Sequence, residues 1–319
     1  MYKSFFELKE NPFNVSPDPR YIVLTKQIEE AFSGLMYGIQ TKKGILTLTG
    51  EVGTGKTTLV NRLLDWLNTE RAKTAFLFNS RLNSNQLLDF VLSEFEITCD
   101  STSKSRQLMK LNEWLLEQFR AGQTAVLIID EAQNLTFPVL EEIRLLTNLE
   151  TASEKLIQIV LSGQPELEER LKLPQLRQLR QRMAVRCKTA PLTKEETHAY
   201  VIERLRIAGA APTAAPIFSP QAIDMMHLYS LGVPRVINLL CEHCLVSAFV
   251  DQKKTVGVEV VDSVARDFDL SDGNAAAAMI APVPPSEKFD LVEALRTLAT
   301  LADRLRQSEQ QDLPKERKL

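Results

Sequence analysis

Short, mainly apolar runs recur through the first part of the chain, each bounded by polar or turn-forming residues. They span residues 45–49, 74–79, 125–129, 156–162 and 183–187. Runs of this length that are rich in β-branched and aliphatic residues predict strands. The run 125–129, Ala-Val-Leu-Ile-Ile, is apolar throughout, which is typical of a strand buried on both faces of a parallel sheet.

Other stretches follow a helical period instead. Residues 26–41 place apolar side chains at three- and four-residue spacing, which predicts an amphipathic helix. Later in the chain, Thr193-Lys194-Glu195-Glu196 is a capping box that opens a helix to about residue 208. Ser219-Pro220 has the N-cap and first-turn residues of another helix, and an apolar helix from Val236 to Val250 follows.

These patterns divide the chain into regions. We predict an α/β domain with its N-terminal segment over residues 1–190 and a small α-helical lid over residues 191–270. Residues 271–285 are rich in Ala and Pro and predict a linker. Residues 286–319 carry leucine and alanine at 4-3-4-3 spacing, which predicts an amphipathic C-terminal helix and a charged tail. That helix is too short to stand alone as a coiled coil, so it can dock on its own chain, a neighbouring subunit or another protein.

Composition narrows the functional classes. The 319 residues are 44% hydrophobic and include 38 basic and 41 acidic residues, a net charge of −3. This balance excludes a broad attraction to nucleic acid but leaves room for a local basic patch. Four cysteines in a chain of this length form no disulfide framework, which favours a reducing, cytoplasmic setting. No apolar stretch is long enough to span a bilayer, and the N-terminus lacks a signal-peptide pattern.

The first chemical signal is a phosphate-binding loop, Gly50-Glu51-Val52-Gly53-Thr54-Gly55-Lys56-Thr57, which fits G-x-x-x-x-G-K-[ST] without a mismatch. A strand is predicted just before it and a helix from Thr58 just after it, as the motif requires. Glycines let backbone N–H groups approach phosphates, and the positive end of the helix faces them. We expect Lys56 to reach the β- and γ-phosphates and the Thr57 hydroxyl to bind Mg²⁺.

The second signal is Asp130-Glu131, directly after the apolar run 125–129. This is the hhhhDE form of the Walker B motif, and α/β folds place ligands at that end of a strand. We expect Asp130 to hold Mg²⁺ through its waters and Glu131 to polarise an attacking water.

A polar residue at the end of the next strand can act beside this carboxylate pair. Gln164 is the first choice for a side chain between the pair and the γ-phosphate, and Ser162 is the second. The alternative is that Gln164 only caps the turn before Pro165.

Arginines supply the next candidates. Arg177, Arg180 and Arg182 precede the last predicted strand, where one of them can reach a γ-phosphate held by a neighbouring subunit, as an arginine finger. For each arginine the alternative is a solvent-exposed basic helix face. Arg235 lies in the first turn of the helix that Pro234 begins, and its alternative is an ordinary surface arginine.

Two further groups of residues allow two interpretations each. The first can form an apolar slot for a nucleotide base or can pack the N-terminal segment onto the core: Pro12, Phe13, Tyr21 and Ile22. The second is Cys241-Glu242-His243-Cys244, which suggests zinc but lies within a helix pattern without a second ligand pair. We therefore interpret both cysteines as small core residues.

Taken together, these motifs resemble those of the AAA+ ATPases, and within them the family of general secretion pathway protein A, the ExeA-like ATPases. The resemblance covers roughly residues 1–268. It rests on the phosphate loop and on Asn11-Pro12-Phe13, Pro17-Asp18-Pro19-Arg20, Ile129-Asp130-Glu131-Ala132-Gln133-Asn134-Leu135, Gly163-Gln164-Pro165-Glu166-Leu167 and Gly232-Val233-Pro234-Arg235.

The resemblance implies a five-stranded parallel sheet of order 5-1-4-3-2 with a helical lid, and ATP bound between subunits. It further implies Gln164 as sensor 1, Arg235 as sensor 2 and Arg182 or Arg180 as the finger. Secretion-type members often continue into a membrane helix and a periplasmic peptidoglycan-binding domain, whereas this sequence continues into the Ala/Pro linker and one predicted helix. The chain therefore looks more like the short, cytoplasmic members associated with exopolysaccharide or surface-structure export.

These observations predict a cytoplasmic, Mg²⁺-dependent ATPase that self-associates into a ring or filament and supports a secretion or export machine, recruited to the inner membrane by a partner. The rival is an ATP-gated scaffold on DNA, as in the related TniB and TnsC ATPases of transposition. The predicted catalytic residues are Lys56, Glu131, Gln164, Arg180 and Arg182. The predicted nucleotide-binding residues are Gly50, Glu51, Val52, Gly53, Thr54, Gly55, Lys56, Thr57, Thr58 and Arg235, and the predicted Mg²⁺ ligands are Thr57 and Asp130.

Overall fold

The computed structural model describes residues 2–14, 18–78, 82–211 and 215–270. The predicted linker 271–285 and the C-terminal helix and tail 286–319 lie outside the described residues. The strands are β1 Ile45–Thr49, β2 Lys73–Leu77, β3 Ala125–Ile129, β4 Ile157–Gly163 and β5 Met183–Lys188. The α-helices are α1 Tyr2–Phe5, α2 Lys26–Gln40, α3 Lys56–Thr69, α4 Ser84–Glu94, α5 Lys104–Arg120, α6 Phe137–Leu146, α7 Pro165–Leu171, α8 Arg177–Gln181, α9 Lys194–Ile207, α10 Pro220–Ser230, α11 Pro234–Val250 and α12 Val258–Asp267. Short 3-10 helices lie at Pro19–Tyr21, Ala132–Asn134 and Pro174–Leu176.

The strands form one parallel sheet of order β2-β3-β4-β1-β5. Counted from the other edge this is 5-1-4-3-2, so the predicted fold class and strand order are confirmed. β1, β3 and β4 are buried along their whole length, as the apolar runs indicated. β2 lies at an edge of the sheet, and its residues alternate between more and less exposed.

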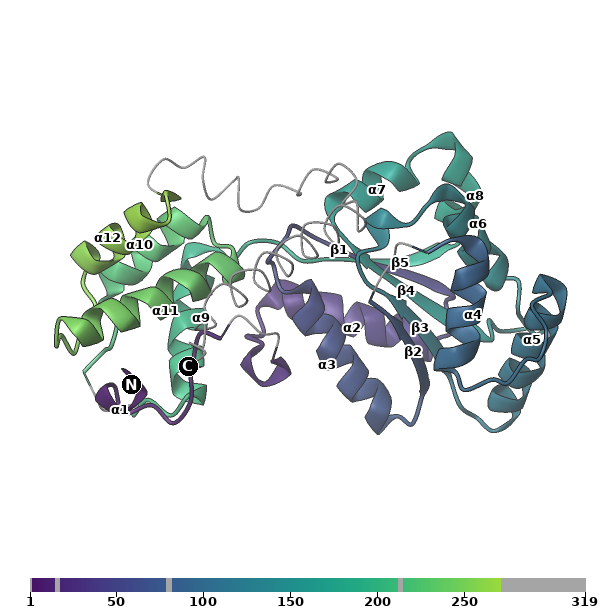
Figure 1. The fold of residues 1–319 in the computed structure, drawn as a ribbon, viewed down its shortest axis with the longest axis horizontal. Helices are drawn as coiled ribbons and strands as arrows, with labels where there is room; N and C mark the ends of the chain where they lie inside the picture. The colour runs from purple at the N-terminus through teal and green to yellow at the C-terminus, as the bar shows by residue number, and fades with distance from the viewer. Residues whose placement is uncertain (1, 15–17, 79–81, 212–214, 271–319) are drawn as a thin grey trace, which may run out of the picture. The chain divides into compact units, whose positions relative to one another are not determined.

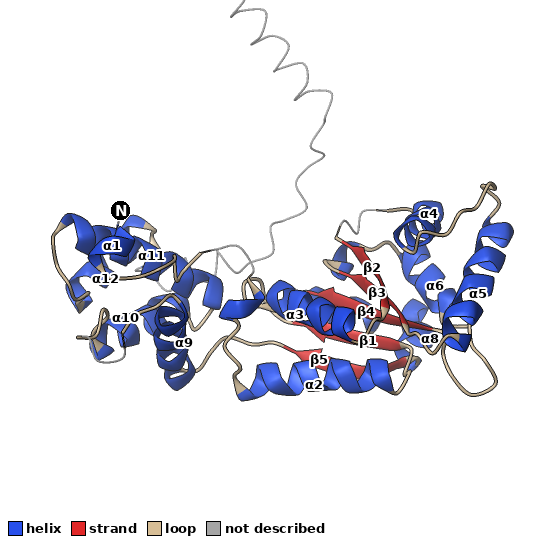
Figure 2. Ribbon diagram, turned by 90° about the horizontal axis from the view of Figure 1, so that it is seen from below, coloured by secondary structure: helices blue, strands red, loops and turns tan. Residues whose placement is uncertain are grey.

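Side chains of strand β3 point alternately to two separate cores. In β3, Leu127 and Ile129 face the core shared with α4, α5 and α6, whereas Val126 and Ile128 face the core shared with α2 and α3. Figure 1 shows these two helix groups on opposite faces of the sheet. α2 runs along β5 (Figure 2), with Gly34 against the Cys187 sulfur. Both faces are therefore covered, and the carboxyl ends of the strands remain as the edge where a ligand can bind.

The helices after β5 enclose a core of their own. α9 begins with the predicted capping box and α10 with Ser219 as N-cap, as the sequence indicated. The same core includes Phe6, Leu8 and Phe13 of the N-terminal segment. Tyr2 Oη and Asn11 Nδ2 both donate to the Glu242 carboxylate on α11, at 2.8 and 3.1 Å. The N-terminal segment is thus fastened to these helices, which we call the helical bundle (α9–α12). The boundary at residue 190 stays a prediction.

None of the helices in the described part of the chain is long and apolar enough to cross a membrane.

Candidate functional site

The phosphate loop joins the end of β1 to the first residue of α3. Gly53 and Gly55 adopt φ values of +80° and +97°, which side-chain-bearing residues rarely reach. A Cβ on Gly53 would also lie 2.8 Å from the Arg235 Cβ. The loop can close only with glycine at these positions, which leaves its backbone N–H groups available to an anion.

Lys56 lies inside this loop, 6% exposed. Its Nζ donates to the carbonyl oxygens of Gly50 (2.7 Å) and Glu51 (2.9 Å). Burial lowers the pKa of Lys56, while the carboxylates of Glu131 and Asp130 act in the opposite direction. An anion in the loop would add to the carboxylates' effect and favour the ammonium form.

Asp130 at the end of β3 gathers two hydroxyl groups. Its Oδ1 accepts a hydrogen bond from Ser162 Oγ at 2.7 Å, and its Oδ2 accepts one from Thr57 Oγ1 at 3.3 Å. Ser162, the second choice at the end of β4, therefore contacts the Asp130 carboxylate. A carboxylate with a neighbouring hydroxyl is a donor set that suits Mg²⁺, which binds few protein oxygens and keeps waters and phosphates as its other ligands.

Glu131 lies beside this pair with a strained backbone, at φ +52°. Its Oε2 accepts a hydrogen bond from Gln133 Nε2 at 2.5 Å and one from Gln164 Nε2 at 3.4 Å. The Gln164 side chain makes no helix-capping hydrogen bond. Of the two interpretations of Gln164, the structure therefore favours the one in which its side chain faces the carboxylate pair.

Gln133 was not singled out from the sequence, although it lies within the run 129–135. Its Oε1 accepts a hydrogen bond from the Gln164 backbone N–H at 3.1 Å while its Nε2 holds Glu131. Arg170 donates to the carbonyl oxygens of Gln133 and Leu135 and so braces the same turn. Gln133 thereby joins the end of β3 to the end of β4. A polar side chain two residues after Asp130-Glu131 was the only available signal.

A cavity of about 360 Å³ lies over the phosphate loop. The predicted residues that line it are Val52, Gly53, Thr54, Gly55, Lys56, Thr57, Thr58, Glu131, Gln164 and Arg235. Gly50, Glu51 and Asp130 do not line it; they contact it through Lys56 and Thr57. Arg235 belongs to the first turn of α11, as predicted, and its backbone N–H donates to the Gly53 carbonyl at 3.2 Å.

The residues of the expected base slot separate into two pairs. Tyr21 and Ile22 line the cavity, whereas Pro12 and Phe13 do not. Phe13 is fully buried, edge-to-face with Phe218 at 5.9 Å between ring centroids, and packs the N-terminal segment onto the helical bundle. Burial and the nearby Glu10 carboxylate raise the pKa of Tyr21 to about 12, so its hydroxyl stays protonated at neutral pH. The packing interpretation therefore holds for Phe13, and a base slot at Tyr21 and Ile22 stays a prediction.

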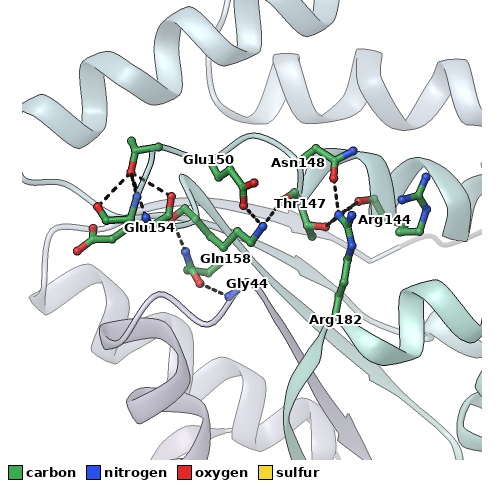
Figure 3. A network of polar contacts seen from close by, with 11 residues as sticks. Gly44, Arg144, Thr147, Asn148, Glu150, Glu154, Gln158 and Arg182 are labelled. Carbon is green, nitrogen blue, oxygen red and sulfur yellow. Dashed lines mark hydrogen bonds and ion pairs between the residues drawn. The ribbon is translucent and has the colours of Figure 1, made fainter.

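The candidate finger arginines lie away from this cavity, before β5. Arg182 donates to Arg144 O at 3.1 Å, Thr147 Oγ1 at 2.7 Å and Asn148 Oδ1 at 2.5 Å (Figure 3). The Arg180 side chain makes no hydrogen bond or ion pair with the described residues. Neither residue lines this chain's own cavity. The arrangement is compatible with a finger that acts on a neighbouring subunit, and which arginine serves stays a prediction.

The zinc interpretation of Cys241 and Cys244 finds no support. Both are fully buried in the core of the helical bundle, and the Cys241 thiol lies 3.3 Å from the Met226 sulfur. Burial raises the pKa of Cys244 to about 12, which disfavours the thiolate that a metal needs. Within residues 2–270, apart from the short undescribed stretches, no three His, Cys, Asp or Glu side chains gather closely enough to hold a metal.

Comparisons with known proteins agree with this geometry. Residues 39–171 match the family described as AAA domain. General secretion pathway protein A of Aeromonas hydrophila is 44% identical over 250 residues, which are 78% of this chain and 45% of the relative. The chain thus spans about half the length of that relative.

Solved structures show the same fold at low sequence identity. The ORC2 protein of Aeropyrum pernix, titled as ADPNP-ADP complexes, has a TM-score of 0.58 at 14% identity, over 81% of this chain and 72% of that one. Cdc6p of Pyrobaculum aerophilum has a TM-score of 0.57 at 18% identity, over 83% and 70%. The 44% identity to general secretion pathway protein A over 78% of the chain, together with the AAA-domain match, identifies the chain as a member of the AAA+ ATPases, of the general secretion pathway protein A type.

Proposed function

We propose that this protein binds Mg²⁺-ATP in the cavity over the phosphate loop and hydrolyses it to ADP and phosphate. One observation carries the proposal: Lys56, Thr57, Glu131 and Gln164 line a single cavity, with Asp130 bonded to Thr57. This set contains a cation for the phosphates, oxygen ligands for a divalent ion and a carboxylate for water, which are the groups that phosphoryl transfer to water requires.

In this proposal the loop binds the triphosphate. Backbone N–H groups from Gly53 to Thr57 and the N-terminal end of α3 bind the phosphate oxygens. Lys56 gives up its bonds to Gly50 and Glu51 and turns its ammonium to the β- and γ-phosphates. Thr57 and Asp130 would hold Mg²⁺, which neutralises charge on the phosphate oxygens when it is bound.

Glu131 acts on the water that attacks the γ-phosphorus. Its carboxylate accepts a hydrogen bond from that water, orients it in line with the leaving ADP and takes up its proton. Gln133 holds the carboxylate at the end of β3 through the 2.5 Å bond. Gln164, bonded more loosely at 3.4 Å, is free to exchange this contact for the γ-phosphate. Arg235 binds the phosphates from the bundle side and connects their state to α11.

We further propose that the active form is a ring or filament in which Arg182 or Arg180 completes a neighbour's site. The output would support assembly of a secretion or polysaccharide-export machine. The similarity to general secretion pathway protein A supports this role, through the half of that relative which the chain spans. In this proposal the protein is cytoplasmic and is recruited to the inner membrane by a partner.

Steady-state ATPase assays over a range of protein concentrations, with and without duplex DNA, test the proposal. We expect specific activity to rise with protein concentration and to ignore DNA. Stimulation by DNA would instead support a scaffold of the transposition type. Absence of hydrolysis at every concentration, by a protein that binds ATP, would contradict the enzymatic function.

Mixing experiments test the finger. An Arg180→Ala or Arg182→Ala variant that lacks the finger should bind ATP yet hydrolyse it about 10³-fold more slowly. Adding Lys56→Ala subunits, which keep the finger but not the nucleotide, should restore part of the activity at mixed interfaces. If neither arginine variant can be rescued in this way, the finger lies elsewhere.

A further inference from the structure

A hydrogen-bond chain of buried side chains ends at the wall of the cavity, one turn of α11 beyond Arg235. Arg204 and Tyr200 of α9 and Asn238 of α11 are each less than one-tenth exposed, and all three line the cavity. Arg204 also donates to the Pro12 carbonyl at 2.6 Å, and its guanidinium lies 4.7 Å from the Tyr21 ring centroid. This cluster therefore lies where the N-terminal segment borders the cavity.

The donor and acceptor types of these three side chains determine the direction of each hydrogen bond between them. Arg204 can only donate, and its Nη1 lies 2.7 Å from the Tyr200 hydroxyl oxygen. Tyr200 must then direct its own proton to its other partner, the Asn238 side chain, at 2.9 Å. That partner atom has to be an acceptor, so it is Oδ1 and not Nδ2. Burial raises the pKa of Tyr200, which keeps its proton in place at neutral pH.

The amide of Asn238 is thereby oriented. Its oxygen is occupied by Tyr200, and its Nδ2 has no hydrogen-bond partner within the described part of the chain. Because Asn238 is only 8% exposed and lines the cavity, a ligand bound in the cavity could accept a hydrogen bond from this N–H₂ group. The cavity is where such a ligand would lie.

The neighbouring wall suits a flat, weakly polar group. Tyr21, Ile22 and Val23 line the cavity beside this cluster, whereas Lys56 and the threonine hydroxyls of the lining belong to the phosphate loop and the start of α3. Pockets of this kind bind a planar ligand against apolar walls and recognise it through hydrogen bonds to a few polar atoms. A purine ring has acceptor nitrogens at its edge and apolar faces that fit such a wall. A phosphate or a metal ion would not bind favourably against an apolar wall.

We propose that Asn238 is a specificity-determining residue that donates a hydrogen bond from Nδ2 to a ring nitrogen of the nucleotide's base. Arg204 and Tyr200 are positioning residues that hold the amide in the donating orientation. This inference rests on the proposed nucleotide binding and assigns the base end of that site.

The test compares three ligands in the presence of Mg²⁺: ATP, ribose 5-triphosphate and inorganic tripolyphosphate. Asn238→Asp keeps the size of the side chain and the acceptor for Tyr200 but loses the N–H donor. We expect its Kd for ATP to rise at least about ten-fold, and the Kd values for the other two ligands to match the parent's. Asn238→Ala should behave in the same way, which separates loss of the donor from the added charge. Tyr200→Phe should show a smaller rise, because the amide can still turn its nitrogen to the base.

Each other outcome overturns the inference. Parent-like ATP affinity in both Asn238 variants would show that Asn238 does not bond to the base. An equal loss for tripolyphosphate would show a structural role, and an equal loss for ribose 5-triphosphate would move the contact to the sugar. Failure of the parent itself to bind ATP or tripolyphosphate would contradict the proposed function rather than this assignment alone.

Discussion

The two ends of the cavity are built in different ways. The phosphate end consists of residues that lie within a few positions of a strand end: the loop after β1, Asp130 and Glu131 after β3, and Gln164 after β4. The end that we propose for the base, called the base end below, combines Tyr21 of the N-terminal segment, Arg204 of α9 and Asn238 of α11. One end is a property of the sheet, and the other requires that the N-terminal segment and the helical bundle pack together.

Because of this difference, substitutions at the two ends should alter different steps of ATP binding and hydrolysis. Strand ends are held by the buried cores on both faces of the sheet, so groups placed there are rigid and suit chemistry. The base end depends on contacts of the N-terminal segment, such as the Arg204 bond to Pro12. Substitutions at the phosphate end should therefore affect the binding of every triphosphate or the hydrolysis step. Substitutions at the base end should affect only the affinity for the nucleoside part of the ligand.

Lys56→Ala should have the largest effect, because it removes the only lysine that lines the cavity among the described residues. We expect ATP and tripolyphosphate affinity both to fall by at least about 100-fold, with hydrolysis lost as a consequence. Isothermal titration measures both. The exposed Lys43→Ala serves as a matched control and should bind like the parent. Retained tripolyphosphate binding by Lys56→Ala would break the distinction between the two ends.

Glu131→Gln should separate binding from chemistry within the phosphate end. The amide cannot take a proton from water, so we expect hydrolysis to slow by about 10²–10⁴-fold while ATP still binds and the assembled form accumulates. Single-turnover kinetics and light scattering with ATP measure the two effects. If this variant hydrolyses ATP like the parent, another group activates the water.

Gln133→Leu removes both side-chain bonds of Gln133 while keeping its approximate volume. Without the 2.5 Å bond the Glu131 carboxylate is no longer held, and we expect kcat to fall roughly ten-fold with Kd for ATP unchanged. Gln133→Glu places a second carboxylate beside Glu131. The two like charges repel each other, so we expect kcat to fall below that of Gln133→Leu. Parent-like kcat in both variants would contradict the positioning role.

Arg204→Met should have the smallest effect on hydrolysis but a distinct one on stability. It deletes a buried guanidinium that bonds Pro12 O and the Tyr200 hydroxyl, so unfolding should become easier by about 2–4 kcal/mol. ATP affinity should fall a few-fold while tripolyphosphate affinity persists. Thermal unfolding and the same titrations check this, with Arg206→Met on the exposed side of α9 as control. Equal losses for both ligands would show that the two ends are not independent.

Most of the sheet and of the phosphate end can be predicted from the sequence. Buried parallel strands appear as continuous apolar runs, and the carboxyl ends of such strands meet at one edge, so the sequence alone predicts that Lys56 and Asp130 lie close together. The run 74–79 gives a weaker signal. β2 is an edge strand with partly exposed residues, so it is not a continuous buried run. Gln133 was missed because its importance comes from reaching across to β4, which no spacing within its own segment reveals.

By itself, the sequence determined the strands, the helix caps, the phosphate loop and the carboxylates, because each depends on neighbouring residues and on a short-range period. Only the tertiary structure decided that Phe13 packs with the helical bundle while Tyr21 lines the cavity, and that Arg204 and Tyr200 orient Asn238. These contacts join residues that are far apart along the chain. Whether a buried polar group serves the core or a ligand depends on the partners that packing brings to it, and a one-dimensional pattern does not contain those partners.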